Sequence, residues 1–437
     1  SLAPGGGLTL TGALAVDGGT VKLDGNYPTG TNNVALGNTA LDSLTSGNEN
    51  TAIGTNALTA NTSGCYNTAV GQGALDSNTT ACSNTAMGMF SVAGNTTGAS
   101  NVGIGRNSLR ANTTAANNTA VGTDSLCANT TGCFNTALGA STLLVNQTGI
   151  CNVAIGASAL RCNTASNNIA VGVQPLYYNT SGTNNTAIGT KALFCNTTAD
   201  NNTALGYNSL LNNTTGAANT ALGIHAMEKN ISGGINVATG AYSLACNTTG
   251  ADNTANGGYA MKENTTGTGN VGVGRSALRC NTTAASNTAV GCGALCLNTT
   301  GASNVAVGKQ ALDANTTGGN NIAIGDNALT SNTTNTTNIA IGASALAANN
   351  AAGDNIGIGQ QAAAANLSGY HLTSIGHYSL LANTSAQGNT AVGHSSLRTT
   401  TTGAANTAVG KQTLCKTTTG GNNVALGYAA LCLNTTG

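Results

Sequence analysis

The sequence predicts an all-β fold, a parallel β-solenoid (β-roll or β-helix) of about 24 coils with a 17-residue repeat. A glycine recurs every 17 residues from Gly37 to Gly427, with one 16-residue step between Gly156 and Gly172, which makes 24 copies. Aliphatic residues recur at fixed positions in each copy, and only 6% of residues are charged and 3% aromatic. A period this short is too small for two packed helices and is typical of solenoids, in which each repeat forms one coil.

Residues 1–32 do not fit the repeat and are predicted to form an N-terminal cap or coupling segment. Apolar residues such as Leu8 and Leu10 alternate there with polar ones between glycine-rich turns, which favours short strands. An ordered leader with no special role is the alternative. Residues 33–437 form the β-solenoid repeat array, which we expect to be one elongated domain whose length scales with copy number.

Each copy is predicted to begin with a strand of four or five residues that ends at the repeat glycine, as in Asn-Thr-Ala-Val-Gly of residues 67–71. The residue three before the glycine is usually Thr, Val or Ile, which suit a pleated strand. The residue just before it is Ile, Val, Leu or Met in 22 of 24 copies, Thr239 and Asn256 excepted, and we expect it to face inward. Between them stands mostly Ala or Gly, which indicates a close approach by a neighbouring wall.

A second strand is predicted around the position four after the glycine. This position is Leu in 20 copies, with Val92, Met227, Met261 and Ala363 as substitutes, and it too should face inward. The polar residues that follow, commonly Asn-Thr-Thr-Gly, predict a turn. The 16-residue step loses its residue within 163–167, inside this turn, so both strands are spared. Coils about 4.8 Å apart would stack into a rod of roughly 115 Å.

Two asparagine columns run along the array. The first stands four residues before the glycine in 23 of 24 copies, with Leu372 as the exception. Asparagines repeated at strand spacing can bond one another along the stack, so we expect an amide ladder with a structural role and no binding role.

The second asparagine column stands seven residues after the glycine in 21 copies, with Leu44, Thr400 and Thr417 as replacements. In 19 copies it opens an Asn-x-Ser/Thr sequon, which marks an exposed turn of a secreted chain. We therefore expect covalent N-linked glycans, and no other cofactor, at Asn61, Asn78, Asn95, Asn112, Asn129, Asn146, Asn179, Asn196, Asn213, Asn230, Asn247, Asn264, Asn281, Asn298, Asn315, Asn332, Asn366, Asn383 and Asn434. The alternative is that Asn and Thr are good turn residues and form sequons by chance.

The 13 cysteines fit an oxidising compartment. Eight of them fall in the same or adjacent columns of successive coils, where neighbouring strands bring Cα atoms near the separation that a disulfide needs. The predicted inter-coil disulfides join Cys65 with Cys82, Cys133 with Cys151, Cys280 with Cys296, and Cys415 with Cys432.

No catalytic or metal site is expected from the sequence. No motif in the sequence brings together a nucleophile, a general base and an acid that would orient the base. The cysteines also lack the paired spacing of a zinc site. His377 and His394 share a column in adjacent coils, but without a third ligand an ordinary surface role is favoured over a metal site. The net charge is zero, so the sequence does not predict a basic surface that would bind nucleic acid. No apolar run approaches the roughly 20 residues that a membrane-spanning helix needs.

The phrase Asn-Thr-Ala-Val-Gly-x-x-Ala-Leu-x-x-Asn-Thr-Thr-Gly is similar to repeats of long surface and tail-fibre proteins of bacteria, phages and large viruses. Its core in residues 338–342, Asn-Ile-Ala-Ile-Gly, also resembles the head repeats of trimeric autotransporter adhesins. The resemblance covers residues 33–437. Those heads are left-handed parallel β-rolls with a shorter coil, so neither handedness nor trimer formation carries over to this chain. The resemblance implies attachment to a host surface.

These features together predict a non-enzymatic structural protein of an extracellular filament or surface appendage, at the cell or virion surface. An uncapped last coil would expose strand edges, so we expect subunits to join head to tail, with residues 1–32 docking on the next subunit. The alternative is the shaft of a trimeric adhesin or tail fibre that binds a host surface. The expected partners are copies of the chain, as a polymer or a homotrimer, and surface glycans or host cells. Ice binding through threonine columns is less favoured, because the paired threonines point two ways.

Overall fold

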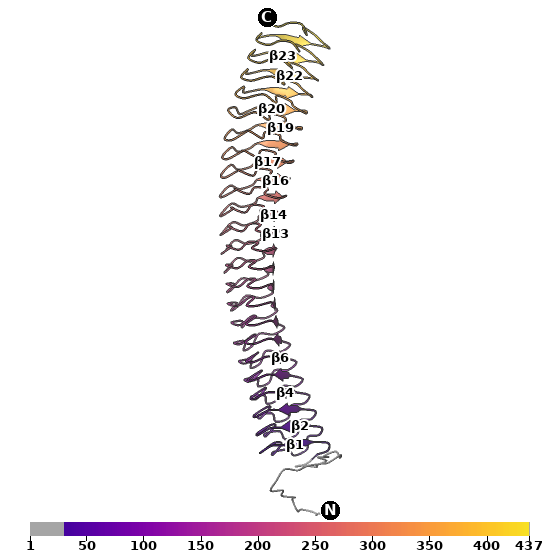
Figure 1. The fold of residues 1–437 in the computed structure, drawn as a ribbon, viewed down its shortest axis with the longest axis vertical. Helices are drawn as coiled ribbons and strands as arrows, with labels where there is room; N and C mark the ends of the chain where they lie inside the picture. Colours follow the sequence, from indigo (N-terminus) through magenta and orange to yellow (C-terminus); the bar gives the residue numbers. More distant parts are fainter. Residues whose placement is uncertain (1–29, 437) are drawn as a thin grey trace, which may run out of the picture. The chain divides into compact units, whose positions relative to one another are not determined.

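The protein is a parallel β-solenoid over residues 30–436, the part of the chain that the computed structural model describes (Figure 1). This part contains 24 strands of three residues each and no helix, so the predicted fold class is confirmed. The predicted N-terminal segment lies almost entirely outside it. The chain divides into two compact units, Ser1–Asn118 and Thr119–Gly437, and each is described by itself.

In the first unit the strands of successive coils pair in parallel. Val34 lies opposite Thr51 and Ala35 opposite Ala52, so the register shifts by one repeat per strand. The pairing continues from β2 to β5 in the same way. The strands of this unit are β1 (Val34–Leu36), β2 (Thr51–Ile53), β3 (Thr68–Val70), β4 (Thr85–Met87) and β5 (Val102–Ile104).

The second unit repeats this arrangement over the remaining strands. The 16-residue coil keeps the register, because Val153 of β8 still lies opposite Ile169 of β9. Residues 163–167 form no strand, which confirms that the missing residue falls in a turn. The strands are β6 (Thr119–Val121), β7 (Thr136–Leu138), β8 (Val153–Ile155), β9 (Ile169–Val171), β10 (Thr186–Ile188), β11 (Thr203–Leu205), β12 (Thr220–Leu222), β13 (Val237–Thr239), β14 (Thr254–Asn256), β15 (Val271–Val273), β16 (Thr288–Val290), β17 (Val305–Val307), β18 (Ile322–Ile324), β19 (Ile339–Ile341), β20 (Ile356–Ile358), β21 (Thr373–Ile375), β22 (Thr390–Val392), β23 (Thr407–Val409) and β24 (Val424–Leu426).

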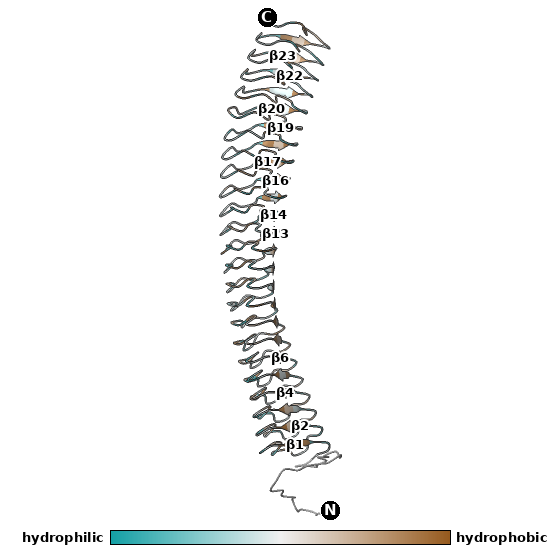
Figure 2. Ribbon diagram, viewed as in Figure 1, coloured by the Kyte–Doolittle hydropathy of each residue, from teal (hydrophilic) through white to brown (hydrophobic). Residues whose placement is uncertain are grey.

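The aliphatic residue just before each glycine faces outward, so the prediction that it faces inward is wrong. Ile324 and Ile341 are each 37% exposed, whereas Ala323 and Ala340 beside them are fully buried. Successive side chains of a strand point to opposite faces, so only one of the two sets can enter the core. The core takes the small residue, and the aliphatic residues that give strands such as β1 their hydrophobic colour in Figure 2 lie outside it.

The predicted second strand around the Leu column is absent from the described residues, and a series of turns stands in its place. In the second coil Asn56 and Leu58 have φ values of 60° and 51°, and the same two positions are left-handed along the array. Left-handed residues cannot continue an extended strand, and they turn the chain sharply. The turn still directs the Leu inward, as predicted, since Leu58 and Leu75 are fully buried.

The small residue in mid-strand packs against the Leu column of the preceding coil. A Cβ added to Gly103 would lie 2.4 Å from Cγ2 of Val92, and one added to Gly272 would lie 3.3 Å from Met261. The core is therefore one aliphatic and one or two alanine-sized side chains per coil. The prediction that a neighbouring wall limits this position to Ala or Gly is confirmed.

Candidate functional site

The strand ladder of the second unit presents an uncharged surface of aliphatic side chains and threonines, with one asparagine, Asn256. We call this surface the strand face. It consists of the residues three and one before each repeat glycine in β6–β24. Ile169, Val237 and Leu205 on it are 40%, 40% and 41% exposed. No Lys, Arg, Asp or Glu stands at either position in these strands. A surface of this kind can pack against another surface that is uncharged and largely apolar.

The first asparagine column forms the predicted ladder in the core wall. The backbone N–H of Asn304 donates to Oδ1 of Asn287 at 2.9 Å, and Nδ2 of Asn304 donates to the same oxygen at 3.2 Å. Nδ2 also donates to the carbonyl oxygen of Gly318 at 2.9 Å. Both asparagines are fully buried, so their amides are satisfied by the neighbouring coils and serve the structure.

The sequon asparagines form a second buried ladder, so the prediction that they lie exposed on a turn is wrong. Nδ2 of Asn298 donates to Oδ1 of Asn281 at 3.0 Å and to the carbonyl oxygen of Gly301 at 2.9 Å. A glycan is attached to Nδ2, and that atom has no access to solvent in the folded coil. Those with no exposed surface are Asn61, Asn78, Asn95, Asn112, Asn129, Asn146, Asn179, Asn196, Asn213, Asn230, Asn247, Asn264, Asn281, Asn298, Asn315, Asn332, Asn366 and Asn383, and only Asn434 is partly exposed.

The first two residues of the Asn-Thr-Thr sequence have a structural role. The asparagine closes the turn by bonding the carbonyl three residues later, and the first threonine donates to the next coil, as Thr299 Oγ1 does to the carbonyl oxygen of Thr316 at 3.0 Å. The asparagine and the first threonine therefore serve coil stacking, whereas the hydroxyl that completes the sequon belongs to the second threonine.

Completing the second ladder tests it. Oδ1 of Asn383 is buried without a hydrogen-bond partner, because Thr400 stands where the next asparagine would donate to it. Thr400→Asn alone would lose the bond from Thr400 Oγ1 to the carbonyl oxygen of Thr417, and its own Oδ1 would face Thr417 without a donor. We therefore expect the double variant Thr400→Asn, Thr417→Asn, which continues the ladder from Asn383 to Asn434, to stabilise the protein by about 1 kcal/mol, the net contribution of a typical hydrogen bond. Urea unfolding of protein from a bacterial host measures this. Thr402→Asn, at an exposed position, is the control and should change stability by less than about 0.5 kcal/mol. A destabilised double variant would contradict the ladder.

The four predicted disulfides are not present, and all 13 cysteines lie within the described residues without an S–S bond. In the pair Cys65 and Cys82, Sγ of Cys82 accepts the backbone N–H of Cys65 at 3.2 Å, while Sγ of Cys65 accepts that of Asn48 at 3.4 Å. Side chains related by one coil point the same way, whereas a disulfide needs them to converge. The same correction applies to the pairs Cys133 with Cys151, Cys280 with Cys296, and Cys415 with Cys432. Burial raises the pKa of the Cys296 and Cys415 thiols, which disfavours the reactive thiolate.

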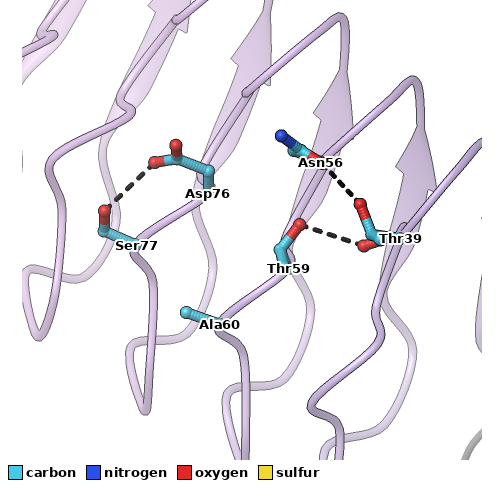
Figure 3. Close-up of a pocket in the computed structure, with 6 residues that line it drawn as sticks. All are labelled: Thr39, Asn56, Thr59, Ala60, Asp76 and Ser77. Atoms are coloured by element: carbon cyan, nitrogen blue, oxygen red, sulfur yellow. Dashed lines mark hydrogen bonds between the residues drawn. The ribbon is translucent and has the colours of Figure 1, made fainter.

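A shallow hollow of about 360 Å³ lies on the turns of the first unit (Figure 3). Thr59 Oγ1 donates to the carbonyl oxygen of Thr39 at 2.9 Å, and Ser77 Oγ donates to Asp76 Oδ1 at 3.1 Å. Burial raises the pKa of Asp76, and the bond from Ser77 partly offsets this. A lone carboxylate with hydroxyl neighbours forms no catalytic pair. The lining residues are Thr39, Asn56, Thr59, Ala60, Asp76 and Ser77.

Aromatic side chains gather in the second unit, a feature that reasoning from the sequence missed. The rings of Tyr242 and Tyr259 stack with centroids 5.4 Å apart, and His225 stacks on Tyr242 at 5.0 Å. Tyr207 meets His225 edge to face at 5.3 Å. These residues stand one or two positions after the repeat glycine. The signal is the run of rings at these positions in four successive coils.

His377 and His394 lie with ring centroids 5.4 Å apart, and within residues 30–436 no group of three His, Cys, Asp or Glu side chains is placed to hold a metal. The described residues also contain no helix that could cross a membrane. No model of a known protein family matches the sequence, and no curated protein matches it significantly.

Proposed function

We propose that this chain is a non-enzymatic structural protein of an extracellular filament or surface appendage, and that copies of it associate side by side through the strand face. The observation that carries the proposal is a long solenoid ladder whose outward strand side chains are uncharged and, apart from Asn256, aliphatic or Thr. The extracellular location is supported by the resemblance of the repeat to surface and tail-fibre proteins. Head-to-tail joining through residues 1–32 stays a prediction.

The strand face is large enough for a stable interface. Nineteen strands about 4.8 Å apart extend for roughly 86 Å, and two side-chain columns make a band roughly 10 Å wide. Its area of about 900 Å² resembles the roughly 800 Å² per partner of specific protein interfaces. Aliphatic side chains occupy 26 of its 38 positions, and monomers rarely expose a contiguous apolar surface larger than a few hundred Å².

A second copy of the chain is the partner that fits this face best. The side chains of two surfaces can interdigitate along the whole length only if both repeat at the same spacing. The strand face of a second copy necessarily has the same spacing. Two such sheets would pack about 10 Å apart, as in β-sandwiches. The same face also supports the alternative of a trimeric adhesin or tail-fibre shaft, in which three strand faces meet around one axis.

Charge placed on the strand face tests the proposal. We expect the double variant Ile324→Lys, Ile341→Lys to sediment as a monomer where the unaltered protein associates, because two ammonium groups would be buried in an apolar interface. The control is Thr330→Lys with Ala347→Lys, which adds the same charge to the same coils at the position that Lys262 occupies naturally. Both variants should keep the circular dichroism of the fold.

Two results would oppose lateral association: an unaltered protein that is monomeric at high concentration, or a strand-face variant that assembles like its control. Electron microscopy of the assembled protein separates the two candidate functions, since continuous fibres support a filament and discrete three-chain rods support a shaft.

A further inference from the structure

The second threonine of the Asn-Thr-Thr turn belongs to a column of exposed hydroxyl groups. The residue nine after the repeat glycine is Thr or Ser in 22 of the 24 coils, and every one of these residues is exposed. The exceptions are Ala351 and the short coil of Gly156, which has one residue fewer in this turn. We call these serines and threonines the hydroxyl column.

The stacking of the coils does not require these hydroxyls. Thr299, eight residues after its repeat glycine, donates through Oγ1 to the carbonyl oxygen of Thr316 at 3.0 Å. Thr300 beside it belongs to the hydroxyl column, and in the described part of the chain no hydroxyl of this column makes a hydrogen bond to another group. Serine and threonine alternate in the column, so a preference for a β-branched residue does not explain it.

Exposure to solvent does not require a hydroxyl at this position either. The residue twelve after the repeat glycine is also exposed in many coils, and it varies widely, as Glu49, Phe134 and Asp252 show. At the hydroxyl column no Asn, Asp, Gln, Glu, Lys, Arg or Gly occurs in any coil, although each of them is common at exposed turns. The hydroxyl group itself is therefore the feature that the repeat keeps.

The sequon does not explain the column. Three coils lack the second asparagine, yet they still carry the hydroxyl, at Ser46, Thr402 and Thr419. Attachment of an N-linked glycan needs both the asparagine and the hydroxyl residue, so in these coils the hydroxyl cannot serve that purpose.

We propose that the hydroxyl column carries O-linked glycans. In each attachment the side-chain oxygen of Ser or Thr attacks the anomeric carbon of a sugar that is activated by a nucleotide or lipid phosphate. The new carbon–oxygen bond replaces the bond to the phosphate leaving group, and the hydroxyl proton passes to a base of the glycosyltransferase. The hydroxyl column and the strand face share no residue, so this inference goes beyond the structural role and does not depend on lateral association.

The spacing of the column suits neutral sugars. Successive coils place the hydroxyls about 4.8 Å apart, which is wider than the roughly 3.3 Å between neighbouring residues of an extended chain. Mucin-like stalks carry O-glycans on such extended Ser/Thr-rich chains, so every coil has room for one sugar. Phosphate groups fit the column less well, because each carries a charge of about −1.5 to −2 and neighbours at this distance would repel one another.

Mass spectrometry of the protein isolated from its native source tests the proposal. We expect an intact mass above that of the polypeptide, and we expect alkaline β-elimination, but not peptide-N-glycosidase, to remove the excess. Fragmentation that keeps glycans attached should place sugars on Thr402 and Thr419, whose coils contain no sequon.

One substitution made in the native host sharpens the test. Thr402→Ala should lose the mass of one glycan. Thr401→Val is the matched control, because it removes the adjacent hydroxyl, which donates to the carbonyl oxygen of Thr418 at 3.2 Å, and it should keep that glycan. A native mass equal to that of the polypeptide would overturn the proposal. Sugars found on the asparagines or on the residues eight after the glycine, or a Thr402→Ala variant of undiminished glycan mass, would overturn it equally.

Discussion

Replacing Gly308 by alanine is expected to destabilise the protein by about 3–5 kcal/mol. Gly308 has a φ of 132°, a conformation that is essentially restricted to glycine. A Cβ there would lie 2.6 Å from the carbonyl oxygen of Gly325 and 2.7 Å from its carbonyl carbon. Both atoms belong to the backbone of the next coil, so the coils would have to separate locally.

The measurement is guanidinium unfolding, with hydrogen exchange of the amides of residues 305–330 to locate the effect. Gly269→Asn is the matched control, because Gly269 has a φ of 64° and a Cβ added to it would have no atom within 4 Å. Asparagine tolerates this left-handed region, so the control should stay within about 0.5 kcal/mol of the unaltered protein. Equal losses from both substitutions would show that coil contact at Gly308 is not the cause.

The period, the parallel register and the buried Leu column could be predicted from the sequence, because each follows from spacing alone. A repeat glycine every 17 residues requires that equivalent residues lie opposite one another, as Val305 and Ile322 do. The short coil was placed correctly for the same reason, since a residue can be lost without harm only where no strand must keep its register.

The direction of the strand side chains could not be predicted from the pattern, because two apolar columns competed for the interior. Hydrophobicity favours Ile324 over Ala323, yet the core is too thin for both Leu329 and an isoleucine in each coil. The left-handed residues after the glycine decide which side chain enters the core, because they direct Leu329 inward. Leu329 itself has a φ of 51°. A Leu-rich pattern does not indicate that the leucine has a left-handed backbone conformation, which is rare for a residue of this kind.

The sequon asparagines and the paired cysteines show a different limit. A local motif reports which residue is present and not which way it points. Asn298 is buried because its amide bonds the coils on either side, and Cys65 and Cys82 point in parallel because the coils are related by translation. In a stack of this kind equivalent side chains repeat their direction, which favours ladders and opposes cross-links between identical positions.

Truncating the Leu column at Leu312 is expected to cost about 3 kcal/mol. Leu312 is fully buried, and Leu312→Ala would leave a cavity between the alanine columns of adjacent coils. The φ of 54° at this residue is equally unfavourable for leucine and alanine, so the loss reports packing and not backbone strain. Because each coil contacts only its neighbours, the weakening should be local.

Hydrogen exchange separates this local loss from global unfolding. The amide of Leu312 donates to the carbonyl oxygen of Ala328 at 2.9 Å, and that of Leu295 to Ala311 at 3.0 Å, so both should exchange faster in Leu312→Ala than in the unaltered protein. Leu312→Met is the control, since Met227 and Met261 occupy this column naturally, and it should cost less than about 1.5 kcal/mol. Faster exchange spread evenly over the second unit would mean that its coils unfold as one cooperative block, in place of the nearest-neighbour stack that the contacts define.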